Sequence, residues 1–236
     1  MNMKSSTIIS LGLVLGLTLL GYLLGGSIIK YKELDRTVTV KGLAQKEVKA
    51  DTVIWPIKYI VASNDIDIMY KKLEKDTKML NKFLLDYGFS KNEITISAPK
   101  IIDKFTRDYG NQDKIKFRYS GTQVMTLYTS SVDKARDAMR EISNYGKKGV
   151  IFSSNNYSSN VEYIYTKLND IKPQMIDNAT QNARQVAKKF AVESSSKLGK
   201  IKNARQGQFS ISQRDKNTPF IKKVRIVSTI EYYLVD

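Results

Sequence analysis

The sequence predicts an α+β protein in which an N-terminal transmembrane helix is followed by one folded domain. Three observations carry this prediction. Residues 7–29 contain no charged side chain, segments of strand and helix periodicity alternate through the rest of the chain, and strand pairs stand at both ends of that part. We therefore expect residues 1–30 to form a membrane anchor, residues 31–36 a short linker, and residues 37–236 a domain with a mixed, largely antiparallel sheet.

The apolar stretch has the length of a membrane-spanning helix. Residues 7–29 would form a helix about 34 Å long, which exceeds the roughly 30 Å hydrocarbon core of a bilayer. A secretory signal peptide has a shorter apolar region and a small-x-small cleavage site, which residues 25–30 match poorly. We expect an uncleaved single-pass anchor. Basic residues after the stretch outnumber Lys4 before it, so the positive-inside rule alone would leave the domain in the cytoplasm.

Two glycine pairs lie within this stretch, Gly12 with Gly16 and Gly21 with Gly25. Glycines four residues apart let two helices approach closely, and pairs that start nine residues apart fall on opposite faces of a helix. This spacing favours self-association of the anchor. The general frequency of glycine in membrane helices explains it equally well.

The first two strands of the domain are predicted by alternating side chains. Residues 37–44 and 52–62 place apolar residues at every second position, as half-buried strands do. Gly42 inside the first strand indicates a bulge or a close approach by another backbone. Pro56 cannot donate to a sheet ladder, so the second strand is expected at a sheet edge or with a bulge there.

Two strand-helix-strand units are predicted in the middle of the chain. The first helix spans residues 65–87, with Ser63 or Asn64 as its N-cap, and has apolar residues at three- and four-residue spacing. The elements that follow are strands at 93–105 and 115–129 joined by the polar turn 107–113, a helix at 132–143, and a short strand near Val150.

A long helix and a β-hairpin are predicted to close the domain. The polar loop 153–160 and a brief strand at 161–166 precede the helix, which spans residues 170–198. Its expected buried stripe consists of Met175, Ala179, Ala183, Ala187, Phe190 and Ser194. Small residues on this stripe predict close packing against the sheet or another helix. The closing hairpin joins strands 200–213 and 224–235.

The composition excludes most catalytic chemistry. The chain contains no cysteine and no histidine, which removes thiol nucleophiles, disulfides, imidazole catalysis and the usual zinc or haem ligands. Asp65 and Asp67 stand at a helix start, where capping explains them. The serines at 194–196 beside Lys197 lack an oxyanion arrangement. We identify no catalytic, cofactor-binding or metal-ligating residue, and we expect a protein that is not an enzyme and has no cofactor.

The charge balance favours anionic partners. Beyond residue 30 the chain carries 37 basic and 23 acidic side chains, a net charge of +14. Such a surface attracts anionic lipids, nucleic acid or wall polymers, although the excess is spread along the chain and a lysine-rich, solubilising composition explains it as well. Lys116-Phe117-Arg118-Tyr119 alternates cations with aromatic residues, which a strand with inward aromatics explains more simply than nucleic-acid binding. We do not expect nucleic acid as a partner.

Two groups of motifs bracket residues 35–236 and carry a family resemblance. The first is Asp35-Arg36-Thr37-Val38-Thr39-Val40-Lys41-Gly42-Leu43-Ala44, then Val48-Lys49-Ala50-Asp51 and Trp55-Pro56. The second is Ala179-x-x-x-Ala183-Arg184-x-x-Ala187, then Leu198-Gly199-Lys200-Ile201 and Ala204-Arg205-Gln206-Gly207-Gln208-Phe209-Ser210-Ile211. In order and spacing these motifs resemble the opening and the closing segment of the SIMPL domain family.

The resemblance implies a bacterial envelope protein, usually periplasmic and in some relatives anchored by an N-terminal helix. Some relatives assemble into ring-like or channel-like oligomers, and others are associated with tolerance of oxidative stress; the family supplies no catalytic residues. We therefore expect a single-pass inner-membrane protein, held by residues 7–29, with its domain in the periplasm or outside the cytoplasm. It would act as a homo-oligomer or by holding partners, with a link to envelope or oxidative stress tolerance. The alternative is an electrostatic binding module for anionic lipid or cell-wall polymer.

Overall fold

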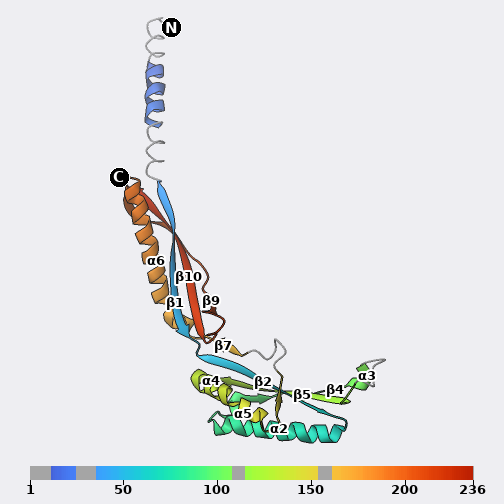
Figure 1. Cartoon of the computed structure of the whole chain (residues 1–236). Helices are drawn as coiled ribbons and strands as arrows, with labels where there is room; N and C mark the ends of the chain where they lie inside the picture. Colours follow the sequence, from blue (N-terminus) through green and yellow to red (C-terminus); the bar gives the residue numbers. More distant parts are fainter. Residues whose placement is uncertain (1–11, 25–35, 108–114, 154–160, 236) are drawn as a thin grey trace. The chain divides into compact units, whose positions relative to one another are not determined.

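A computed structural model of the chain describes residues 12–24, 36–107, 115–153 and 161–235 (Figure 1). Residues 12–24 are helical. Within the described ranges, no helix is long and apolar enough to cross a membrane. The two ends of the predicted anchor, and most of the predicted turn 107–113 and loop 153–160, lie outside the described residues.

The chain divides into two compact units. Unit 1 combines Met1–Lys46, Asn169–Ser210 and Val224–Asp236, and unit 2 combines Glu47–Leu168 with Ile211–Lys223. Each unit has its own sheet, where the sequence analysis expected one sheet. All strand registers resolved in these sheets are antiparallel.

The sheet of unit 1 has the strand order β1-β10-β8. The short strand β9 also pairs with β10, and its residues 211–213 are counted with unit 2. The strands are β1 (Thr37–Lys49), β8 (Lys197–Gln206), β9 (Ser210–Gln213) and β10 (Ile221–Val235). The long helix α6 (Leu168–Glu193) runs along β1 and β10 and covers one face of this sheet (Figure 1). The antiparallel pairing of the predicted closing hairpin is confirmed by β8 and β10, but the predicted strand 200–213 is two strands, β8 and β9.

A seam of small residues brings α6 close to β1. Ala179, Ala183 and Ala187 are fully buried on α6, and Gly42 is the buried residue of β1 that faces them. A Cβ atom at Gly42 would overlap the carbonyl oxygen of Ala179 and lie 2.6 Å from the backbone nitrogen of Ala183. The expected close backbone approach at Gly42 is confirmed, and so is the close packing of the alanine-rich helix.

Two residues of the predicted stripe on α6, Phe190 and Ser194, are wrong. Phe190 is 56% exposed, and Ala191 is buried in its place. Both spacings from Ala187 are compatible with a helix of 3.6 residues per turn. The four-residue step keeps a small side chain against the sheet, where the distance between the backbones leaves no room for a phenyl ring. The helix also ends at Glu193, earlier than expected, so Ser194 lies beyond it.

The sheet of unit 2 has the strand order β3-β5-β2-β6, with β4 on β5 and β7 on β2. The strands are β2 (Thr52–Ser63), β3 (Ile94–Ile96), β4 (Lys100–Asp103), β5 (Tyr119–Thr129), β6 (Ile151–Phe152) and β7 (Glu162–Ile164). The helices are α2 (Ile66–Asp86), the 3-10 helix η1 (Lys91–Glu93), α3 (Lys104–Arg107), α4 (Val132–Glu141) and α5 (Ser143–Gly146). Helix α2 packs on β2 and β5, and the predicted inward face of β2 is confirmed as core: Val53, Trp55, Ile57, Tyr59 and Val61.

Two local predictions for unit 2 are corrected. Strand β2 lies inside its sheet, with β5 on one side in continuous register through Pro56, so neither an edge strand nor a bulge in this pairing is present. On its other side, β7 pairs with residues 52–54 and β6 with residues 59 and 60, so the described pairings leave the proline without a partner there. The N-cap of α2 is Asp65 instead of Ser63 or Asn64.

The predicted strand 93–105 is two strands, β3 and β4. Pro99 stands in the gap between them, and its missing N–H explains why the ladder is interrupted. The segment 116–118 precedes β5 and is not part of it, so the expected alternation of inward aromatics fails at Phe117, which is 40% exposed.

Candidate binding surface on unit 1

The candidate site is the face of the unit 1 sheet that points away from α6. Successive residues of a strand point to opposite faces. On β10, Ile230 and Tyr232 are buried toward α6, so Thr229 and Glu231 belong to the opposite face. We call this opposite face the open face. Each of its three strands contributes polar side chains to this face.

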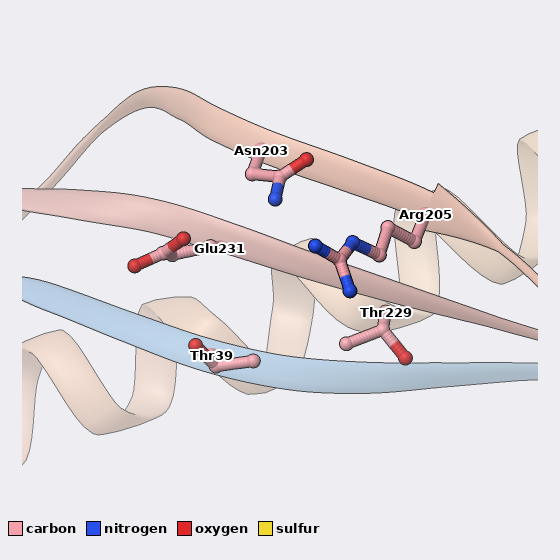
Figure 2. Close-up of a pocket in the computed structure, with 5 residues that line it drawn as sticks. All are labelled: Thr39, Asn203, Arg205, Thr229 and Glu231. Carbon is pink, nitrogen blue, oxygen red and sulfur yellow. The ribbon is translucent and has the colours of Figure 1, made fainter.

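A shallow pocket of about 220 Å³ lies on the open face (Figure 2). Each of the three strands contributes to its lining, which consists of Thr39, Asn203, Arg205, Thr229 and Glu231. The strand register fixes this grouping, because Thr229 is the Cα partner of Arg205 and Glu231 is the partner of Asn203. The pocket therefore combines one cation, one carboxylate and neutral hydrogen-bonding groups.

The carboxylate of Glu231 is held in place by its neighbours. The Thr37 hydroxyl donates to Glu231 Oε1 at 2.8 Å, and Lys202 Nζ lies 4.0 Å from the same oxygen. The Glu231 side chain is 27% exposed, so it is partly shielded and still accessible. These contacts orient the carboxylate on the sheet surface without neutralising the face as a whole.

The guanidinium of Arg205 is the exposed cation of the pocket. Within the described residues, no hydrogen bond or ion pair engages it. Lys202 adds a second cation nearby, with Nζ 5.4 Å from the centre of the Tyr233 ring. An exposed guanidinium beside aligned hydroxyl and amide groups suits a carboxylate or phosphate, because its planar fork can bind such groups with two hydrogen bonds.

Strand β8 adds an exposed sheet edge to this surface. It lies at the end of the strand order, and residues 200–206 are all exposed. Lys197, Lys200, Lys202 and Arg205 lie on this strand. Cations on an edge strand discourage pairing with another cationic strand and favour an acidic or anionic partner.

The acidic residues and serines that could suggest catalysis in the sequence have structural roles. Asp65 accepts hydrogen bonds from the backbone N–H groups of Asp67 at 2.8 Å and Ile68 at 2.9 Å, so it caps α2. Ser196 accepts a hydrogen bond from Arg36 Nη2 at 2.8 Å and donates to the Ser194 carbonyl at 3.2 Å. The serines thus form the turn between α6 and β8.

Arg118, the cation of the segment 116–119, is also engaged. Its Nη2 lies 2.8 Å from Asp103 Oδ2, and the guanidinium stacks on the rings of Phe105 and Tyr119 at 5.3 and 4.9 Å. The hydrogen bond to Arg118 lowers the pKa of Asp103. Within the described ranges, no group of three or more acidic side chains is placed to hold a metal ion.

The open face was not predicted from the sequence. The sequence of β10 contains the relevant pattern, because Thr229, Glu231 and Tyr233 alternate with the inward-facing residues of the strand. Their proximity to Arg205 depends on the register between β8 and β10, which includes an irregularity between Glu231 and Tyr232. Periodicity alone does not give this register.

The fold defines the class of protein: an α+β protein with antiparallel sheets and one long helix packed on the sheet of unit 1. The chain belongs to the SIMPL family, described as a protein of unknown function (DUF541), whose family model matches residues 38–225. The expected family membership is thereby confirmed. No curated protein matches the chain.

Proposed function

We propose that this is a membrane-anchored envelope protein that acts without catalysis, by assembling with copies of itself or by holding partners. The observation that carries the proposal is the open face of unit 1, where Arg205 and Glu231 line the same shallow pocket. A surface with both charges is self-complementary. Two copies related by a two-fold axis would place the arginine of each opposite the glutamate of the other.

A charge-swap experiment on the full chain in detergent tests self-assembly. Native mass measurement is expected to show an oligomer for the wild type and loss of assembly for both Arg205→Glu and Glu231→Arg, because each change places like charges opposite one another. The double variant restores opposite charges and is expected to reassemble. Lys82→Glu, an equal charge change at an exposed residue of α2, is the control and should leave the oligomer unchanged. A monomeric wild type, or single variants that assemble normally, would contradict the proposal.

The second candidate function is electrostatic binding of anionic lipid or cell-wall polymer, and the cations along β8 favour it. Polyphosphate is a simple probe for the polymer, added to the full chain held in neutral-lipid nanodiscs. Its affinity is expected to fall about tenfold or more as salt rises from roughly 50 to roughly 200 mM, because screening weakens contacts between exposed charges. Neutral dextran is the control polymer. Equal affinity for both polymers, or no dependence on salt, would rule this candidate out.

We place the domain outside the cytoplasm, on the basis of the resemblance to envelope proteins and against the charge count around residues 7–29. Protease added to intact spheroplasts tests this orientation. Digestion of the chain beyond Lys30 is the expected result. Protection until the cells are lysed would place the domain in the cytoplasm and support the positive-inside rule instead.

A further inference from the structure

Positive charge is concentrated at one end of the α6–β8 hairpin of unit 1. Residues 168–183, the first part of α6, carry two acidic residues and one basic residue. Residues 184–202, the rest of α6 and the start of β8, carry six basic residues and one acidic residue, a net charge of +5. Charge is therefore unevenly distributed along the hairpin. Most of its cations lie in the half that contains the turn at Ser194–Ser196.

Exposed apolar side chains lie at this same end. Val192 is 73% exposed, Phe190 is 56% exposed and Val235 is 47% exposed. Val235 belongs here because it is the Cα partner of Lys197, the first residue of β8. An aromatic and two aliphatic side chains among lysines are typical of surfaces that lie in a membrane interface.

The chain enters unit 1 at this end. The Arg36 carbonyl accepts a hydrogen bond from the backbone N–H of Leu234 at 2.8 Å, and Arg36 Nη2 donates to Ser196 Oγ at 2.8 Å. Arg36 is seven residues beyond Ile29, the last residue of the uncharged stretch. Whatever conformation the intervening residues adopt, seven residues span at most about 25 Å.

We propose that the α6–β8 end of unit 1 rests on the surface of the membrane that anchors the chain, with anionic phospholipid as its ligand. In this position Phe190 and Val192 enter the headgroup region, and the lysines of residues 184–202 contact lipid phosphates. The inference rests on the proposed membrane anchoring. Beyond the anchoring, it specifies the surface that faces the bilayer and the lipid headgroups that this surface contacts.

Two arguments favour lipid over a protein partner at this end. The tether limits the distance to the bilayer to a few headgroup thicknesses, so a lipid surface is always within reach. Attraction between a basic surface and an anionic leaflet acts over about one Debye length, roughly 8 to 10 Å, and the six cations of residues 184–202 lie on the two segments that meet there. Glu193 opposes this attraction and leaves the end positive.

The absence of cysteine allows a direct test with single-cysteine variants of the full chain. Val192→Cys and Asn178→Cys each take an environment-sensitive dye, and the chain is reconstituted in nanodiscs that contain phosphatidylglycerol and a headgroup-level quencher. Both residues are exposed on α6. They are 14 residues, about 21 Å, apart along the helix and lie within about 40° of the same face, which makes position 178 a matched control.

The dye at position 192 is expected to show blue-shifted emission and at least about twofold stronger quenching than the dye at position 178. Replacing phosphatidylglycerol by phosphatidylcholine, or introducing Lys188→Glu with Lys189→Glu, should remove most of this difference. Equal quenching at both positions in anionic nanodiscs would overturn the inference. A blue shift without lipid quenching would overturn it in favour of a protein contact.

Failure of the anchoring itself gives a different result. If the chain does not co-purify with nanodiscs or is released by alkaline carbonate, the proposed anchoring is wrong and the lipid contact fails with it. If the chain stays membrane-bound while position 192 remains in water, only the lipid contact is wrong.

Discussion

Gly42 and the alanines of α6 make unit 1 sensitive to a single methyl group. The Cβ of Gly42→Ala would overlap the Ala179 carbonyl oxygen and lie 2.8 Å from the Ala183 Cβ, so the helix or the strand must move. We expect the variant to lower the free energy of unfolding by about 3 kcal/mol or more, the upper range for overpacking. Urea unfolding followed by circular dichroism measures this loss.

Gly146→Ala is the matched control for the glycine experiment. Among the described residues, no atom beyond the chain neighbours and the local helix backbone lies within 4 Å of a Cβ at this position. The change should alter the free energy of unfolding by no more than about 0.5 kcal/mol. A similar loss in both variants would mean that the effect comes from glycine flexibility and not from the contact with α6.

Asp76 of α2 predicts an unusual dependence of stability on pH. It is 2% exposed, its Oδ2 accepts no hydrogen bond from the residues that the structure describes, and Lys72 Nζ lies 3.6 Å away. Burial raises the pKa of Asp76, despite the opposing charges of Lys72 and Lys75. A raised folded-state pKa contributes stability below the ordinary value near 4 and loses it as pH rises. We therefore expect Asp76→Asn to stabilise the chain by roughly 1 kcal/mol at pH 7 and by less at pH 4, measured by urea unfolding.

Asp51 of unit 2 should affect the pH dependence of stability with the opposite sign. Burial alone would raise its pKa, but hydrogen bonds from the backbone N–H and hydroxyl of Thr166 outweigh burial and lower the pKa. A lowered pKa contributes stability above the ordinary value near 4 and loses it as pH falls. Asp51→Asn should therefore destabilise the chain by roughly 1 kcal/mol at pH 7, with a smaller effect in acid. If both aspartate variants shift stability in the same direction at pH 7, one of these assignments is wrong.

At the scale of elements, the start of α2 depends on one side chain. Asp65 accepts hydrogen bonds from two backbone N–H groups of the first turn, whereas Ser131, the N-cap of α4, makes no side-chain cap bond. Asp65→Ala should cost about 1 kcal/mol of stability, and Ser131→Ala should cost much less. Thermal unfolding by circular dichroism compares the two. Equal losses would show that the cap bond of α2 contributes nothing.

The sequence predicted best those elements that have one buried face and no interruption. Strand β2 and helix α2 were found within one or two residues, because their apolar periodicity extends over more than ten residues. The segment 93–105 failed because both halves carry strand-like residues, while Pro99 divides them between different parts of β5. A single proline changed the pairing without changing the pattern of side chains.

At the scale of the whole molecule, the proposed anchor predicts how the chain behaves in membranes. Leu15→Arg with Leu19→Arg places two charges near the middle of residues 7–29, each costing roughly 3 kcal/mol in a membrane-centred helix. The double variant should be released by alkaline carbonate, which the wild type should resist. Leu15→Met with Leu19→Met is the control and should behave as the wild type. Equal extraction of the two double variants would show that this stretch is not the anchor.

The candidate surface was less predictable than the fold. The net charge indicated anionic partners, but the positions of Arg205 and Glu231 depend on pairing between β8 and β10 and on the helix that covers the other face of the sheet. These are long-range contacts, which local periodicity does not encode. Side-chain periodicity predicted most of the elements, and neither the family motifs nor the composition placed a surface.

Unit 1 is built from distant parts of the chain, and this has a consequence for biosynthesis. Thr37 bonds to Glu231, 194 residues later in the sequence. At about 5–20 residues per second, a ribosome needs on the order of 10–40 s to synthesise that interval. During this time β1 has emerged but β10 has not, while nearly all of unit 2 is complete. In ribosome-bound chains that stop before residue 221, unit 2 should therefore resist protease. Residues 37–46 should be digested in the same chains.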